Sequence, residues 1–283
     1  MSEIKLENVT YFHGKDTPYE IKALDQINLT VPEGTVTGLI GHTGSGKSTL
    51  VQMFNGILKP ENGRVLLDGY DIWEKPKEIR NIRFRVGLVM QYPEYQLFEE
   101  TVWKDIAYGP QNMGLSKDEI AERVNEAAAF ADLDPDLLGK SPFDLSGGQK
   151  RRAAIAGVIA MRPEVLVLDE PAAGLDPRGR DAIFRNIVEY QRKSGSTVVI
   201  VSHSMEDMAR FCDHLIVMSN GHILMQGNRD EIFSQSDALE SVGLDIPQIT
   251  KLMLTLRKMG VEVDSGIYTV EQAEAALKKL YTK

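Results

Sequence analysis

Residues 41–48 read Gly-His-Thr-Gly-Ser-Gly-Lys-Ser and are the most informative stretch of the chain. It fits the phosphate-binding pattern G-x-x-x-x-G-K-[ST] at every fixed position. The glycines let backbone N–H groups turn inward around a phosphate, where a Cβ would obstruct them. Lys47 can supply positive charge to the β- and γ-phosphates, and Ser48 can offer its hydroxyl to Mg²⁺. We therefore predict that the chain binds a triphosphate nucleotide together with Mg²⁺.

The segments on either side of this loop support that prediction. Residues 35–40 are apolar enough for a buried strand, and residues 49–56 have the apolar spacing of a helix. A strand, a glycine-rich loop and a helix form the required context, and the helix N-terminus adds partial positive charge beside the phosphates. The alternative is a glycine-rich loop with no ligand. The predicted nucleotide-binding residues are Gly41, His42, Thr43, Gly44, Ser45, Gly46, Lys47, Ser48 and Thr49.

Composition limits the other possibilities. The chain has 283 residues, 42% of them hydrophobic, and a formal net charge of −9. Such an acidic protein has no general electrostatic reason to bind nucleic acid. Its one cysteine, Cys212, cannot form an internal disulfide and fits a reducing compartment. Its longest apolar run, residues 153–161, is far shorter than the ~20 residues that span a bilayer, so we expect a soluble chain.

Strand and helix signals alternate along most of the sequence. Apolar strand signals at 165–168, 197–201 and 214–218 are separated by a helical pattern at 179–193, which predicts an α/β fold with a mainly parallel sheet. The alternating pattern within residues 1–31 suggests half-buried strands. After about residue 235 the pattern changes to two short amphipathic helices. These helices could pack on the main body or form a surface for self-association.

A pair of acidic residues follows one of the apolar strands. Asp169 and Glu170 come directly after Val165–Leu168, at the carboxyl end of a strand that reads as buried on both faces. The phosphate-binding loop emerges at the same edge of a parallel sheet. Asp169 can hold Mg²⁺, and Glu170 can act as the general base that directs a water molecule. An apolar run before Asp-Glu is weak evidence alone, but it is strong beside the loop.

The pentapeptide Leu145, Ser146, Gly147, Gly148 and Gln149 identifies the family. With it the chain resembles the ATP-binding-cassette (ABC) ATPases, and the match extends over roughly residues 3–235. The resemblance implies a P-loop NTPase fold with an N-terminal antiparallel β subdomain, a helical signature subdomain at about 92–160, and a helical extension at 236–283 used for dimerisation. It also implies that this signature serves the nucleotide of an opposing subunit. The alternative for the pentapeptide alone is an ordinary helix cap.

Three further family elements follow in the expected order. Gln91 resembles the glutamine-loop residue that senses Mg²⁺ and the γ-phosphate. Asp176 lies in a segment that resembles the D-loop, and His203 resembles the switch histidine that contacts the γ-phosphate and the catalytic glutamate. Family members also stack adenine on an N-terminal aromatic residue. The alignment places His13 there, although a shift of register would give the role to Tyr11.

Residues 91–98, Gln-Tyr-Pro-Glu-Tyr-Gln-Leu-Phe, resemble the glutamine loop of energy-coupling factor and cobalt/nickel importer ATPases. The insertion at 16–20 resembles the second of the two ATPases that these systems often pair. The resemblance implies a membrane T-subunit, a substrate-binding S-subunit, a heterodimer in preference to a homodimer, and a peripheral position on the cytoplasmic face of the membrane. The cargo would be a vitamin or a metal ion.

The acidic residues near Gln91 suggest how the T-subunit is contacted. We expect one or more of Glu94, Glu99 and Glu100, Glu94 among them, to receive a basic residue of the T-subunit, the alternative being a solvated acidic loop. The competing function is a non-transport soluble ABC ATPase of the DNA repair or translation type. Those proteins typically carry coiled coils, tandem cassettes or basic arms, which this acidic single cassette lacks.

Overall fold

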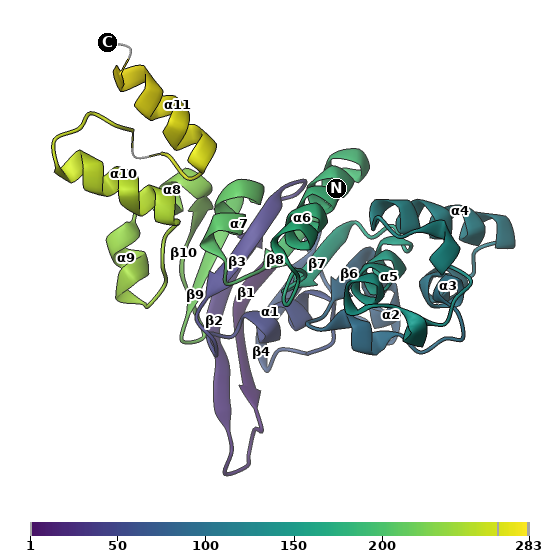
Figure 1. Cartoon of the computed structure of the whole chain (residues 1–283). Coiled ribbons are helices and arrows are strands. Elements are labelled where there is room, and N and C mark those ends of the chain that lie inside the picture. The colour runs from purple at the N-terminus through teal and green to yellow at the C-terminus, as the bar shows by residue number, and fades with distance from the viewer. Residues whose placement is uncertain (1, 265, 282–283) are drawn as a thin grey trace.

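The computed structural model describes residues 2–264 and 266–281, and two sheets organise them (Figure 1). The smaller sheet is antiparallel, with strand order β2-β1-β4-β5. It forms from β1 (Ile4–His13), β2 (Ile21–Val31), β4 (Asn62–Leu67) and β5 (Tyr70–Asp71). This is the predicted N-terminal antiparallel β subdomain.

The larger sheet has six strands in the order β10-β9-β3-β8-β7-β6. All neighbouring strands pair in parallel except β9 and β10, which form an antiparallel pair. Its strands are β3 (Val36–Gly41), β6 (Val86–Val89), β7 (Val165–Asp169), β8 (Thr197–Val201), β9 (His214–Ser219) and β10 (His222–Asn228). The fold is therefore the predicted α/β arrangement with a mainly parallel core sheet.

The core strands are apolar throughout because both of their faces are covered. Alternate residues of β7 enter two different apolar clusters: Leu166 and Leu168 pack with the helices of one face, and Val165 and Val167 pack with the other face. The second cluster also contains the inward residues of the antiparallel sheet and of α1 (Lys47–Phe54). Burial on both sides explains why these strands read as continuous apolar runs in the sequence.

The helices are distributed along the molecule in the order of the chain (Figure 1). The helices α2–α5 lie at one side of the molecule, α8–α11 lie at the other, and α1, α6 and α7 lie beside the sheets between them. The bounds are α2 (Ile79–Arg85), α3 (Val102–Asn112), α4 (Lys117–Phe130), α5 (Gly147–Ile159), α6 (Pro177–Ser194), α7 (Met205–Phe211), α8 (Arg229–Phe233), α9 (Ser236–Ser241), α10 (Gln248–Lys258) and α11 (Val270–Tyr281). Four 3₁₀ turns add η1 (Pro76–Glu78), η2 (Pro93–Gln96), η3 (Pro135–Leu137) and η4 (Pro142–Asp144).

The C-terminal extension both packs on the body and exposes apolar residues. Leu239, Leu244 and Tyr268 belong to the main core cluster, whereas α10 and α11 share a small cluster of their own. Leu252 and Met259 remain exposed. Of the helices in the described ranges, none has both the length and the apolar character needed to cross a membrane. The use of the extension in dimerisation stays a prediction.

Candidate nucleotide site

The phosphate-binding loop joins the carboxyl end of β3 to the first turn of α1. Gly46 is the N-cap of α1, with φ at +101°, and a Cβ at this position would lie 2.7 Å from the backbone oxygen of Ala23. Only glycine fits such a conformation and such close contact with β2. The loop therefore delivers Lys47 and Ser48 to the start of the helix, where the backbone N–H groups are unpaired.

Lys47 is held inside its own loop. Its ammonium group donates to the backbone oxygens of Gly41, at 2.7 Å, and His42, at 3.0 Å. Burial lowers the pKa of Lys47, and the carboxylates of Glu170 and Asp169 oppose that effect. An incoming phosphate would compensate the buried charge more directly, because it would bring negative charge to the ammonium group.

A cavity of about 390 Å³ opens above this loop. Its volume falls within the range typical of small-molecule sites. Many of the residues predicted from the sequence meet here, although they come from four different segments. The predicted residues in the cavity wall are His13, Thr43, Gly44, Gly46, Lys47, Ser48, Thr49, Gln91, Asp169 and Glu170. Ser45 is fully buried within the loop itself.

The first acidic residue of the cavity lies beside the loop's serine. Burial raises the pKa of Asp169, and a hydrogen bond with Ser48 partly offsets the effect. A carboxylate and a hydroxyl side by side are oxygen ligands of the kind that Mg²⁺ accepts, with nucleotide phosphates and water completing its shell. The residues present therefore fit a magnesium ion at this position.

The second acidic residue has an unusual backbone. Glu170 has φ at +52°, a left-handed conformation that costs free energy in a residue other than glycine. Its N–H donates to the backbone oxygen of Val201 at 3.0 Å, which holds it to the end of β8. Its carboxylate oxygen Oε1 lies 2.9 Å from Nδ1 of His203. Strain of this kind is frequent at active sites, and it aims Glu170 into the cavity.

His203 and Glu170 are thus brought together across 33 positions of sequence. The His203 side chain is 80% exposed, whereas that of Glu170 is only 14% exposed. The exposed ring can therefore contact a ligand in the cavity mouth while it holds the glutamate from one side.

The two candidates for adenine stacking occupy different environments. His13 lines the cavity, and its Nε2 lies 3.0 Å from Oγ1 of Thr49. Tyr11 is half-buried against the apolar cluster of the antiparallel sheet and packs edge-to-face on His13, with ring centroids 5.0 Å apart. The stacking role remains a prediction, and the position of His13 favours that residue.

Sequence reasoning missed four residues in the cavity wall. Ile21, Lys22 and Ala23 on β2 and Val201 on β8 line the cavity as well. Ile21 pairs directly with His13 in the β1–β2 ladder and is 65% exposed. The sequence signal for this residue was the position of an apolar isoleucine directly after the polar insertion at 16–20.

The signature does not line this cavity. Ser146 is the N-cap of α5 and forms a capping box with Gln149, in which each side chain bonds the other's backbone N–H. Leu145 is buried beneath them. A Cβ added to Gly147 would meet no atom within 4 Å, and one added to Gly148 would meet only Leu175 at 3.8 Å. Packing within the chain therefore does not explain these glycines.

The D-loop aspartate is also a helix cap. Asp176 accepts a hydrogen bond from the N–H of Gly179 at 2.7 Å and begins α6. The structure places it outside the cavity wall described above.

Glu94, for which a basic partner from the T-subunit was expected, already has a basic partner within the chain. Glu94 forms a two-point ion pair with Arg151 on α5, with Nη2 to Oε1 at 2.9 Å and Nε to Oε2 at 3.2 Å. The Arg151 side chain is 4% exposed and that of Glu94 17%. The same guanidinium donates to the backbone oxygen of Ala173. Arg151 thus ties the segment after Gln91, the signature helix and the turn after Glu170 together.

Comparisons with known proteins agree with this geometry. The profile of the ABC transporter family matches residues 24–173. Two proteins named energy-coupling factor transporter ATP-binding protein EcfA2, from Clostridium acetobutylicum and Clostridium tetani, are each 51% identical to the chain, over 98% of it and 97% of their own length.

Solved structures give the same result. The structure of cbiO1 from Clostridium perfringens, described as part of the ABC transporter complex cbiONQ, covers 89% of this chain and 98% of its own, with a TM-score of 0.75 and 41% identity. The dimeric ATP-binding cassette MJ0796, bound to ADP and Pi, covers 80% of this chain and 98% of its own, with a TM-score of 0.72 and 29% identity. The chain therefore belongs to the ABC transporter family, among the energy-coupling factor transporter ATP-binding proteins, and is a transport ATPase.

Proposed function

We propose that the chain drives an energy-coupling factor importer by closing on a second, related ATPase. The observation that carries this proposal is the division of the site. The cavity holds the loop, Gln91 and the acid pair, and His203 bonds Glu170 beside it, whereas Gly147 and Gly148 face open space elsewhere. An exposed helix N-terminus at Ser146 suits a phosphate supplied by another chain. The structure of MJ0796 was solved as a dimer with ADP and Pi, which supports this arrangement.

The residues of the cavity suggest how hydrolysis proceeds. Lys47 pairs with the β- and γ-phosphates. Ser48 and Asp169 would hold Mg²⁺, which would supply positive charge against the charge that develops on the phosphates. Glu170 orients the attacking water and accepts its proton. His203, already bonded to Glu170, positions that carboxylate and contacts the γ-phosphate. Gln91 completes the wall and reports the state of the nucleotide to the segment that follows it.

The T-subunit is proposed to dock in a groove beside that segment. This groove of about 680 Å³ lies between α2, η2, α3 and α5. Phe98 and Tyr108 line it with their rings edge-to-face, 5.0 Å apart, and they are 59% and 47% exposed. Asp105 accepts hydrogen bonds from the N–H groups of Phe98 and Glu99 and so fixes the groove wall. Glu94, which lies in η2 beside the groove, would transmit movement of the docked T-subunit through Arg151 to α5 and to the turn after Glu170.

A charge in the groove tests this docking site. Phe98→Asp should abolish assembly with the membrane subunits and leave ATP binding unchanged, because Phe98 lies outside the nucleotide cavity. Tyr70→Asp is the matched control, since Tyr70 is 74% exposed on the antiparallel sheet, away from the groove. Normal assembly of the Phe98 variant, measured by co-purification from detergent, would exclude the groove as the docking site.

The partners are proposed to be a T-subunit, an S-subunit and an ATPase that differs from this chain. The relatives' names support the energy-coupling factor assignment, and the insertion at 16–20 supports an unlike ATPase partner. The proposed location is the cytoplasmic face of the membrane. Native mass spectrometry of the detergent-solubilised complex tests the proposal: it should show one copy of this chain with one related ATPase. Two copies of this chain would refute the heterodimer, and purification without membrane subunits would favour a soluble ABC ATPase.

A further inference from the structure

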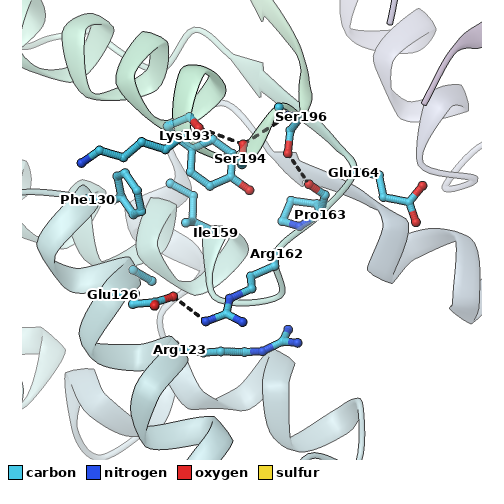
Figure 2. A pocket seen from close by; sticks show the side chains of 13 residues that line it. Arg123, Glu126, Phe130, Ile159, Arg162, Pro163, Glu164, Lys193, Ser194 and Ser196 are labelled. Carbon is cyan, nitrogen blue, oxygen red and sulfur yellow. Dashed lines mark hydrogen bonds and ion pairs between the residues drawn. The ribbon is translucent and has the colours of Figure 1, made fainter. Parts of the chain in front are cut away.

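A second cavity, of about 410 Å³, lies where the helical region meets the core. Figure 2 shows its walls, in which Arg123 and Phe130 of α4 and Ile159 of α5 face the end of α6 and the turn into β8. Lys193 and Ser194 belong to α6, and Ser196 directly precedes β8. Apolar groups form much of the lining, and the basic side chains of Arg123, Arg162 and Lys193 surround them. The cavity is large enough for a small organic molecule.

This cavity lies at the opposite edge of the core sheet from the nucleotide site. Pro163 and Glu164 precede β7, and Ser196 precedes β8, so the cavity lies at the amino ends of these parallel strands. Asp169 and His203 belong to their carboxyl ends. Five residues of strand separate the two edges by roughly 16 Å. A molecule bound here would therefore not occupy the nucleotide site.

Among the described residues, one buried polar group of the cavity wall lacks a hydrogen bond of good geometry. Tyr190 is 3% exposed, and the hydroxyls of Ser194 and Ser196 lie near its own hydroxyl without forming such a bond. The hydroxyl of Ser194 donates to the backbone oxygen of Tyr190, and that of Ser196 donates to Pro163. An unsatisfied buried hydroxyl costs stability, so it needs an explanation such as a missing ligand. The ring of Tyr190 also packs edge-to-face on Phe130, with centroids 5.5 Å apart.

The cavity also contains a cation without an acid partner. Arg123 uses Nη1 to donate to the backbone oxygens of Met161, at 3.0 Å, and Ala160, at 3.5 Å. Within residues 2–264 and 266–281, Arg123 forms no ion pair, and its Nε–Nη2 edge has no hydrogen bond. Burial lowers the pKa of Arg123, and repulsion by Arg162 adds to this effect. The open edge of a guanidinium matches the two oxygens of a carboxylate.

The other charges around the cavity are already paired. Arg162 bonds Glu122 at 2.8 Å and Glu126 at 2.6 Å. Glu164 is paired with Arg85, and Lys193 with Glu189. Two donors of the cavity wall therefore still need an acceptor: the Nε–Nη2 edge of Arg123 and the hydroxyl of Tyr190.

We propose that this cavity binds a small aromatic carboxylate that carries a second hydrogen-bonding oxygen. The carboxylate would accept from the free edge of Arg123, the ring would lie on Phe130 and Ile159, and the second oxygen would meet the hydroxyl of Tyr190. Such a ligand would brace the helical region against the core, because it contacts α4 and α5 on one side and α6 on the other.

Calorimetric titration with 6-hydroxy-2-naphthoate tests the site in the full-length protein. We expect saturable binding with a Kd of about 1 mM or tighter, as ligand efficiency predicts for a molecule of this size. Saturating ATP should not displace it. The neutral amide of the same ring system should bind about tenfold more weakly or worse, because it cannot form the charged pair with Arg123. Absence of saturable binding, or competition by ATP, would overturn the proposal.

Two variants assign the contacts. Arg123→Gln should weaken 6-hydroxy-2-naphthoate about tenfold or more, whereas Arg192→Gln should leave it unchanged, because Arg192 is exposed on α6 and lies outside the cavity. Tyr190→Phe should weaken the hydroxylated probe about fivefold but leave 2-naphthoate, which lacks the hydroxyl, unaffected. Its melting temperature should not fall, since the lost hydroxyl formed no hydrogen bond of good geometry. Equal affinity of both variants and the natural chain for the probe would overturn the site.

Discussion

The buried ion pair between Arg151 and Glu94 permits a quantitative prediction. Arg151→Met retains most of the side-chain volume but removes the guanidinium, so it leaves the Glu94 carboxylate and the Ala173 oxygen without their donor. Both partners are removed from solvent, with 4% and 17% of their side chains exposed. Loss of one member of such a pair costs much more than loss of a surface pair.

The magnitude follows from this burial. Breaking a buried pair costs ~3–5 kcal/mol, and the lower value applies because Glu94 keeps some contact with water. For a chain of this size, a loss of about 3 kcal/mol lowers the melting temperature by about 6 °C. The double variant Arg151→Met/Glu94→Leu should recover most of that loss, because no charge is then left buried and unpaired.

Differential scanning calorimetry of the natural chain, Arg151→Met, Glu94→Leu and the double variant tests the prediction. The matched control is Arg152→Met, the next residue on the same helix. Its ion pair with Asp132 is more exposed, at 29% and 69% of the two side chains, and should contribute less than about 1 kcal/mol. The reasoning is refuted if Arg151→Met melts no lower than Arg152→Met. It is also refuted if the double variant melts as low as the sum of the two single losses predicts.

Three further changes test the site and the core. Glu170→Gln should still bind ATP but hydrolyse it at least ~10²-fold more slowly, measured by phosphate release, and near-normal hydrolysis would rule out a general base at this position. Asp169→Asn should raise the melting temperature of the nucleotide-free protein at pH 7 and weaken Mg²⁺-dependent ATP binding. Burial raises the pKa of Asp169 in the folded state, so its ionised form is destabilising, and the gain should shrink as the pH falls through that pKa; a lower melting temperature at pH 7 would contradict this. Burial also raises the pKa of Cys212, so a thiol reagent should react only after unfolding, and rapid labelling of the native protein would be inconsistent with its burial.

Much of the fold followed from local sequence because its determinants are local. Strands buried on both faces need apolar runs, so residues 165–168, 197–201 and 214–218 could be recognised without neighbours. The loop at 41–48 could be recognised because a phosphate imposes glycine and lysine at fixed spacing. The capping box between Thr269 and Gln272 is equally local, since it depends on a few adjacent residues.

The remaining features depend on contacts between distant segments. Glu94 is 57 positions from Arg151, and nothing near either residue shows that the other will reach it. The left-handed backbone of Glu170 arises because β7 and β8 hold its ends, which no propensity of glutamate predicts. The unsatisfied Tyr190 hydroxyl likewise becomes visible only after α4, α5 and α6 meet.

The lysine of the phosphate-binding loop acts as an internal competitor of the nucleotide. Lys47 uses two of its three N–H donors on the backbone oxygens of Gly41 and His42, so a nucleotide that takes more than the third donor must compete with these bonds. Each bond displaced would weaken the binding of ATP and of ADP alike by about 0.5–1.5 kcal/mol. The loop therefore lowers the affinity for both nucleotides, and this loss favours release of ADP and exchange for ATP between rounds of hydrolysis.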